Sequence, residues 1–422
     1  MIEKSARSNP VSRGSKTRRT PASPKSSSSA IPASPKVSPQ SPRTPLPLSP
    51  IYHRKIGARN VTSGVLWIIL ALAAFFAADS LLFRTGWYTK YLEPDSSAGT
   101  LESHLYWLDS APRSSQPEVL VVGDSRIAEG FSAVTANAAA GGRLHFWNFG
   151  VSGTTPRVWY YALRAADPTR RRFAAIAFAL DTYSDDDWFA EFDRRTSDQN
   201  YLVMQLGLRD CFGFAQSMHD FPLGLHAFFG CLFRGIILRD DVQALLAKPT
   251  ARLPHVADWR ANGLRYITAY EGMPTNLSGM SVDWRHRTIQ FPDRIPQATR
   301  DNVTRFVLRE PADQTGEVAR YRRRWLGGIL DAYRDSPTRL IFLQLPRGPI
   351  VDPEAGKVHN TGFATAAAQS PDVAVLPPDT FTDLERPDLF ADGLHLNRDG
   401  RPIFSTRLGE RIDSILTKGG SR

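Results

Sequence analysis

The longest apolar run of the chain lies near its beginning, from Val61 to Ala78, and contains no charged side chain. Asp79 interrupts the run, and further apolar residues end at Phe83. A stretch of this length is close to the ~20 residues that a helix needs to cross a bilayer core. We therefore expect a transmembrane anchor over residues 61–83, followed by a juxtamembrane linker over 84–115. A cleaved signal peptide is the alternative, although about sixty residues precede the run, far more than such a peptide usually has.

Shorter apolar runs downstream have the length of buried strands. Val119–Val122, Phe173–Leu180 and Leu340–Leu345 are each bounded by polar or turn residues. This pattern is typical of strands that a parallel sheet buries on both faces. Between them the apolar residues change to helical spacing, as in Gly316–Arg334. The alternation predicts an α/β domain with a central parallel sheet over residues 116–418.

A long segment, from about 184 to 312, lies between the predicted strands Phe173–Leu180 and Leu340–Leu345. It exceeds what a connection between two strands requires, so we expect an insertion that caps the domain or offers a contact surface. It contains a second apolar run, Phe221–Leu238. We expect a buried or interfacial helix there, because a second span would put the two ends of the domain on opposite sides of the membrane.

Charge is distributed unevenly along the 422 residues, whose formal net charge is +10. Residues 1–60 hold twelve Lys or Arg and one acid, which leaves −1 for the remainder. Residues 1–58 are also rich in Ser and Pro, so we expect a disordered tail that is attracted to anionic lipid. The rest has no basic bias toward nucleic acid. The positive-inside rule predicts a single-pass protein with its tail in the cytoplasm and its α/β domain on the other side of the membrane. We expect this membrane to be the cell inner membrane and the compartment to be the periplasm.

Two short motifs far apart in the chain carry the residue types of acyl chemistry. Gly123-Asp124-Ser125 follows the first predicted strand and begins a segment of helical spacing, so Ser125 is expected at the carboxyl end of a strand. Asp392 and His395 stand three residues apart near the C-terminus. A serine hydroxyl needs an imidazole to take its proton and a third group to hold that imidazole. The sequence therefore predicts a catalytic triad of Ser125, His395 and Asp392.

These motifs resemble those of the SGNH/GDSL hydrolase family. In that family the nucleophile lies in a GDS block, and the base lies in a late DxxH block that often continues as HLNxxG. The corresponding late segment here runs from Asp392 through Asn397 to Gly400. The resemblance implies a three-layer α/β/α, flavodoxin-like fold and an acyl-enzyme formed at Ser125.

The other blocks of the family are matched less closely. The segment from Asn148 to Gly153 resembles the second block; Gly153 matches the glycine whose N–H joins the oxyanion hole, and Asn148 is a candidate substrate contact. The third block is usually GxND, but Asp181 stands near the expected asparagine. An ionised carboxylate donates no hydrogen bond, so Asp181 is expected to orient the Gly153 loop, bind a substrate hydroxyl or serve the structure alone. Arg347 is expected to meet an anionic group or to lie in solvent.

The expected function is that of a serine-dependent acyl-ester hydrolase or O-acyltransferase acting on cell-envelope glycans. The layout is similar to that of the alginate O-acetylation proteins and the D-alanyl-transfer protein of teichoic acid modification. That similarity implies an acylated polysaccharide or other envelope glycan as substrate, and a multi-pass membrane acyltransferase as partner. A non-catalytic SGNH-like scaffold that binds a glycan or a partner is the alternative, suggested by Asp181 and by the long insertion.

Cys211 and Cys231 are the only cysteines of the chain. An oxidising compartment would allow one disulfide between them, and two buried thiols are the alternative. The sequence has no CxxC, HExxH, Walker or strand-linked GxGxxG motif. We therefore expect neither a metal nor a cofactor.

Overall fold

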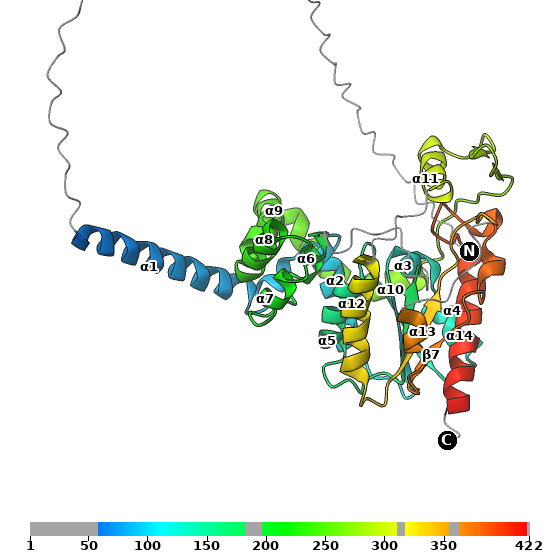
Figure 1. The fold of residues 1–422 in the computed structure, drawn as a ribbon, viewed down its shortest axis with the longest axis horizontal. Helices are drawn as coiled ribbons and strands as arrows, with labels where there is room; N and C mark the ends of the chain where they lie inside the picture. Colours follow the sequence, from blue (N-terminus) through cyan, green and yellow to red (C-terminus); the bar gives the residue numbers. More distant parts are fainter. Residues whose placement is uncertain (1–57, 182–195, 310–316, 354–362, 420–422) are drawn as a thin grey trace, which may run out of the picture. The chain divides into compact units, whose positions relative to one another are not determined.

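Five parallel strands form the central sheet. The computed structural model describes residues 58–181, 196–309, 317–353 and 363–419 (Figure 1). The strands are β1 (Glu118–Gly123), β2 (His145–Gly150), β3 (Ala175–Leu180), β6 (Arg339–Gln344) and β7 (Val373–Val375). Their order in the sheet is β2-β1-β3-β6-β7, and all neighbouring pairs are parallel. The predicted α/β class with a parallel sheet is confirmed.

Helices cover both faces of this sheet. Side chains alternate along a strand, and in β1 Leu120 and Val122 join one apolar cluster while Val119 and Val121 join another. The first cluster is completed by α2 (Ser97–Ser110), α5 (Pro156–Ala166) and α12 (Glu317–Tyr333). The second is completed by α3 (Ser125–Gly130), α4 (Ala133–Ala139) and α14 (Gly400–Gly419). Figure 1 shows α5 and α12 on one side of the sheet and α4 and α14 on the other.

The segment after β1 forms two helices, although its apolar spacing suggests a continuous one. α3 ends at Gly130, and α4 begins after Ser132. The Ser132 hydroxyl accepts a hydrogen bond from the Thr135 N–H at 3.3 Å and thereby caps α4. The break leaves α3 as a short helix whose first residue is Ser125.

The predicted apolar helix near the beginning of the chain is confirmed as α1 (Ala58–Phe83). Its residues Gly64–Phe83 are long and apolar enough to cross a membrane. The expectation of a linker over 84–115 is wrong, because this segment contains η1 (Tyr88–Tyr91) and α2, whose Leu101 and Leu108 are buried in the core. Residues 1–57 of the predicted tail lie outside the described part of the chain.

The described residues between β3 and α12 form a largely helical region. Its helices are α6 (Ser197–Leu202), α7 (Asp210–Ala215), α8 (Phe221–Leu232), α9 (Arg234–Ala247), α10 (Pro249–Ala269) and α11 (Gln297–Val307). A two-stranded antiparallel sheet joins β4 (Ser281–Asp283) to β5 (Thr288–Gln290). The apolar run Phe221–Leu238 is divided between α8 and α9, which are bent by 67°. Cys211 of α7 and Cys231 of α8 form a disulfide. Of the two expected alternatives, a disulfide or two buried thiols, the structure therefore has the disulfide.

Short elements complete the C-terminal part. These are α13 (Phe363–Ala367), η3 (Thr382–Leu384) and η4 (Pro387–Leu389). They precede a bend that contains Asp392 and His395, and α14 follows it. The bend therefore lies between η4 and a helix packed on α4, which fixes both of its ends.

Candidate active site

Ser125 is the first residue of α3, directly after the turn that ends β1. Asp124 has an extended backbone, and its side-chain Oδ1 accepts a hydrogen bond from the Arg126 N–H at 2.9 Å. This side chain therefore caps α3. Ser125 is held between a buried strand and a capped helix, at the carboxyl end of β1. Ligands of open α/β sheets bind at this end of the strands.

The three side chains predicted from the two motifs lie together. His395 Nε2 is 2.8 Å from Ser125 Oγ, and His395 Nδ1 is 2.9 Å from Asp392 Oδ2. If Nδ1–H donates to the carboxylate, then Nε2 is left with a lone pair that accepts the hydrogen bond from the serine hydroxyl. The imidazole ring and the carboxylate are mostly buried, since only 15% of the His395 side chain and 19% of the Asp392 side chain are exposed. The geometry is that of a nucleophile, a base and a group that orients the base.

The bend around Asp392 is ordered by its own hydrogen bonds. Asp392 Oδ1 accepts from the N–H groups of Leu394 and His395 at 2.8 and 2.9 Å. Asn397 Oδ1 accepts from the Gly400 N–H at 2.9 Å, where α14 begins. Burial raises the pKa of the Asp392 carboxyl. The hydrogen bond and the charge of the His395 ring, together with the hydrogen bonds from the backbone N–H groups of Leu394 and His395, outweigh this effect, so the pKa lies below its ordinary value. The Asp392 carboxyl is therefore ionised at neutral pH, where it orients His395.

The Asn148 side chain is engaged by backbone groups of the fold, which favours a structural role over its assignment as a substrate contact. Its side-chain Nδ2 donates to the carbonyl oxygens of Ile127 and Phe131 at 3.1 and 2.9 Å, and its Oδ1 accepts from the Gly150 N–H at 2.8 Å. A Cβ on Gly150 would lie 2.2 Å from the Ala128 backbone nitrogen. The amide of Asn148 and the missing side chain of Gly150 thus hold α3 close against β2.

Gly153 lies in the turn that follows β2 and has a φ of +76°. A Cβ at this position would also lie 2.7 Å from the Tyr201 hydroxyl. That hydroxyl donates a hydrogen bond to the carbonyl of Ser152 at 2.7 Å. Glycine is therefore required here both by the backbone conformation and by the close approach of Tyr201.

Asp181 follows β3 and forms an ion pair with Arg126, the residue after the predicted nucleophile. The Arg126 side chain is 8% exposed and that of Asp181 15%. Arg126 Nε also lies 3.7 Å from Asp124 Oδ1. Among the roles expected for Asp181, this contact favours the structural one, because the carboxylate neutralises a covered guanidinium beside Ser125.

Arg347 meets an anionic group of the protein itself, the carboxylate of Glu385, and does not lie in solvent as the alternative expectation had it. Its Nε and Nη2 donate to the two carboxylate oxygens of Glu385 at 2.9 and 2.8 Å, and its backbone N–H donates to Oε1 at 2.9 Å. Glu385 is almost fully covered. This bidentate ion pair supplies acceptors for the guanidinium N–H groups, and it joins the end of β6 to the loop before the bend.

Residues of the helical region that precedes α12 also reach the predicted site, through contacts that the sequence did not predict. Asn302 of α11 accepts the Gly393 N–H through its Oδ1 at 3.0 Å. Tyr270, after α10, donates its hydroxyl hydrogen bond to Glu129, which lies one helical turn after Ser125. No local pattern identifies either residue, because each contact depends on how this region packs on the sheet.

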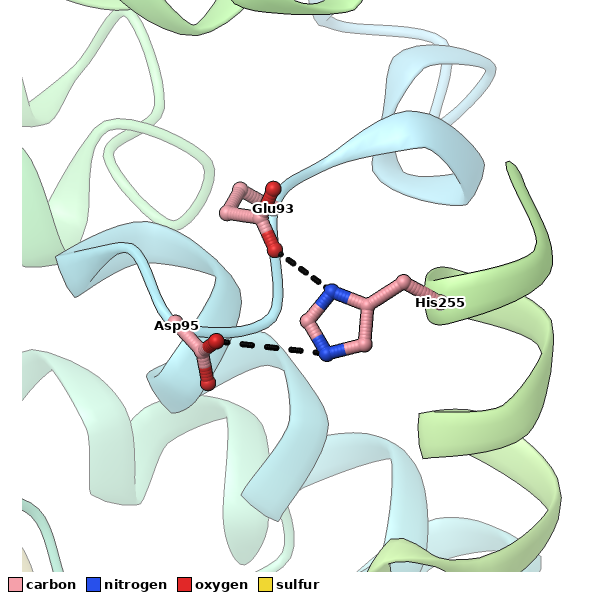
Figure 2. Close-up of side chains that lie close together, drawn as sticks. All are labelled: Glu93, Asp95 and His255. Atoms are coloured by element: carbon pink, nitrogen blue, oxygen red, sulfur yellow. Dashed lines mark ion pairs between the residues drawn. The ribbon is translucent and has the colours of Figure 1, made fainter. Parts of the chain in front are cut away.

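Figure 2 shows a second group of titratable side chains, which consists of Glu93, Asp95 and His255. His255 Nδ1 is 2.9 Å from Glu93 Oε1, its Nε2 is 3.9 Å from Asp95 Oδ2, and the potential ligand atoms lie within 4.8 Å of one another. However, Arg252 Nε is 2.7 Å from the other Glu93 oxygen. Because a guanidinium at this distance repels a cation, the group acts as an ion-pair network that joins α10 to the segment after η1.

A cleft of about 370 Å³ lies beside this network, between α2 and α10. Glu102, Trp259 and Arg260 are among the residues that line it, and the triad is not. The cleft and the predicted active site are therefore separate features of the domain.

The triad is assembled from segments 270 residues apart in the chain. Neither a protein-family model nor a curated protein matches this sequence. What the arrangement can do follows from its atoms: the imidazole can take the proton of the serine hydroxyl, and the carboxylate can stabilise the resulting imidazolium.

Proposed function

We propose that this chain is a membrane-anchored member of the SGNH/GDSL hydrolase family, and that it hydrolyses acyl esters or transfers acyl groups on cell-envelope glycans. The observation that carries the proposal is the 2.8 Å contact between Ser125 Oγ and His395 Nε2, with His395 Nδ1 held by Asp392. The strand order also supports it, because β2-β1-β3-β6-β7 corresponds to the flavodoxin-like order 2-1-3-4-5.

In the proposed reaction, His395 takes the proton of Ser125 as Oγ attacks the acyl carbonyl carbon. The carbonyl π electrons move to the oxygen, and the N–H groups of Ser125 and Gly153 are the proposed donors to this oxyanion. Collapse of the intermediate breaks the ester bond, and His395 returns the proton to the leaving alcohol. Water or a sugar hydroxyl then attacks the acyl-enzyme by the same steps, which gives hydrolysis in the first case and transfer in the second.

The proposed location is the inner membrane, with the α/β domain in the periplasm. α1 supplies an apolar helix of sufficient length, and twelve cationic residues lie among the first 60. The disulfide between Cys211 and Cys231 supports an oxidising compartment. In this location an acylated polysaccharide would be within reach, and a multi-pass acyltransferase is the proposed donor of acyl groups.

The test is labelling of the full-length protein, in detergent, with a fluorophosphonate probe. We expect labelling of the wild type and its loss in Ser125→Ala and in His395→Ala. Ser110→Ala, which changes an exposed serine at the end of α2, is the matched control and should label normally. Absence of labelling in a folded wild type would reject the activated serine and favour the binding scaffold.

A second measurement separates hydrolysis from transfer. An aryl ester is supplied as the acyl donor, with and without a glycan acceptor. Both the free acid and the acylated glycan are quantified. A hydrolase releases acid at a rate that the acceptor does not change, whereas a transferase diverts acyl groups to the glycan.

A further inference from the structure

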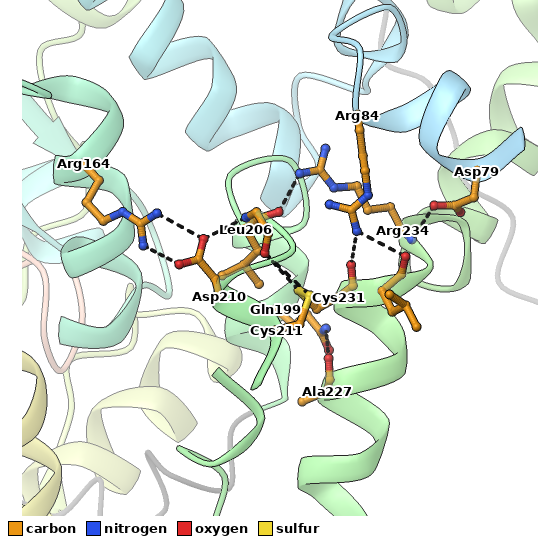
Figure 3. The surroundings of a disulfide bond; sticks show 12 residues. Asp79, Arg84, Arg164, Gln199, Leu206, Asp210, Cys211, Ala227, Cys231 and Arg234 are labelled. Atoms are coloured by element: carbon orange, nitrogen blue, oxygen red, sulfur yellow. Dashed lines mark hydrogen bonds and ion pairs between the residues drawn. A yellow bond between two sulfur atoms is a disulfide. The ribbon is translucent and has the colours of Figure 1, made fainter. Parts of the chain in front are cut away.

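The corner between α8 and α9 is fixed to the end of the apolar helix α1 (Figure 3). Asp79 of α1 accepts hydrogen bonds from the N–H groups of Arg234 and Gly235, at 3.0 and 2.7 Å, and so caps the N-terminus of α9. In return, the Arg234 guanidinium donates to the Phe83 carbonyl at 2.6 Å, at the C-terminus of α1. Arg84 donates to the Cys231 carbonyl at 2.5 Å, near the C-terminus of α8. Three helix ends are thus capped by one another.

This corner contacts α1 well inside the apolar segment, and not only at its end. The Phe233 ring, between α8 and α9, lies 5.3 Å from the Phe75 ring and 6.0 Å from the Phe76 ring, centre to centre. Phe75 precedes Phe83 by eight residues, which is ~12 Å along a helix. The 20 residues of the candidate span measure ~30 Å, about the thickness of a bilayer core. With α1 across a bilayer, Phe233 therefore lies below the surface of its apolar layer.

The helices beside this corner expose large apolar side chains. On α8, Phe221, Leu225 and Phe229 recur every four residues and form one exposed stripe, with 79% of Phe221 accessible. The opposite side of α8, which includes Ala227 and Cys231, is buried. Neither helix can cross the core by itself, because 12 and 14 residues measure only ~18 and ~21 Å.

We propose that α8 and the corner between α8 and α9 form a membrane-embedded elbow, whose exposed apolar stripe Phe221–Leu225–Phe229 inserts among the lipids of the leaflet in which α1 ends, while the exposed Arg239 and Asp240 further along α9 lie outside the apolar layer. The occupant of this surface is lipid, because the stripe is continuous with a helix that already requires lipid around it. The charged groups at the corner fit this placement, since Asp79, Arg84 and Arg234 direct hydrogen bonds to backbone groups at helix ends. The inference rests on the proposed anchoring by α1 but not on the proposed chemistry at Ser125.

The test uses the full-length protein in liposomes of phosphatidylcholine and phosphatidylglycerol. A benzophenone amino acid replaces Phe221, Leu225 or Phe229 in turn, and lipid adducts are quantified by mass spectrometry after irradiation. The same substitution at Leu72 of α1 reports contact with the bilayer core. At Val134 of α4, which is 54% exposed, it serves as the control for an apolar site outside the elbow. Because all five side chains are exposed or partly exposed, the replacements should leave the fold intact, which circular dichroism checks.

We expect lipid adducts at the three elbow positions at a level similar to Leu72 and at least about tenfold above Val134. Adducts at Leu72 with only background at the elbow would overturn the elbow while leaving the anchor in place. Background at Leu72 as well would reject the anchor itself. Cross-links from the stripe to a protein in native membranes, without lipid adducts, would replace the lipid surface by a partner interface.

Discussion

The ion pair between Arg126 and Asp181 is the feature beside the nucleophile whose removal has the clearest expected cost. Asp181→Asn keeps the shape of the side chain and deletes its charge, which leaves the covered Arg126 guanidinium without its partner. Breaking a buried ion pair in this way costs about 3–5 kcal/mol of unfolding free energy. Asp124 Oδ1, 3.7 Å from Arg126 Nε, compensates part of the loss, so we expect about 3 kcal/mol, or a factor of ~150 in the folding equilibrium.

The assay is a double-mutant cycle of Arg126→Met, Asp181→Asn and the double variant, measured by denaturant unfolding of the full-length protein in detergent. The double variant should be less destabilised than the sum of the two single changes, because it leaves no unpaired charge. Asp383→Asn is the matched control: its pair with Arg407 is largely exposed, and such pairs contribute about 0–1 kcal/mol.

A loss below about 0.5 kcal/mol for Asp181→Asn, or additive single changes, would refute the structural role assigned to this carboxylate. Turnover gives an independent check. Asparagine at position 181 restores the amide that the GxND block of the family usually has. If position 181 served the oxyanion hole, the variant would turn over faster; we expect no gain, because the unpaired Arg126 disturbs the start of α3.

Further predictions concern three other positions. Asp392→Asn should lower turnover about 10⁴-fold, as expected when the orienting carboxylate of a triad is lost. Because its pKa is lowered from 3.8, Asp392 stabilises the fold at neutral pH, and this contribution is lost as the pH falls below 3.8 and through the folded pKa; in urea unfolding, the difference between wild type and Asp392→Asn should therefore be largest at pH 7 and shrink as the pH is lowered through this range. Gly153→Ala should cost about 1–3 kcal/mol in thermal unfolding, from its positive φ and the Tyr201 contact, whereas an unchanged melting temperature would contradict the turn geometry. Asp79→Ala should cost about 2 kcal/mol because two N–H groups of α9 lose their acceptor, and Asp240→Ala, an exposed acid of the same helix, should cost much less.

The sequence was sufficient to predict the parallel sheet apart from its short edge strand β7, and the proximity of Ser125, His395 and Asp392, because both have local signatures. Continuous apolar runs mark buried strands, and a motif at the end of such a strand has a known place in an α/β sheet. α2 was not predicted, because its buried face includes the small residue Ala98 and the polar residue His104 and so has no clear apolar period.

The partners of Asp181 and Arg347 were also beyond reach of the sequence. The first pair requires that β1 and β3 be neighbours, since Arg126 follows one strand and Asp181 the other. The second joins the end of β6 to a glutamate 38 residues later. Strand order and loop packing decide such contacts, and neither is encoded in the spacing of residues within one element.

The reciprocal caps of α1, α8 and α9 also impose an order on the synthesis of the protein. Asp79 emerges from the ribosome 156 residues before Gly235, the residue whose N–H it binds. At about 5–20 residues per second, this interval lasts roughly 8–30 s. During that time the end of the anchor has no partner from the elbow, and a carboxyl group remains unpaired in its last turns. In the proposed topology, the last turns of α1 are therefore capped only after translation has passed Gly235, so the placement of α1 in the membrane is coupled to the folding of α8 and α9.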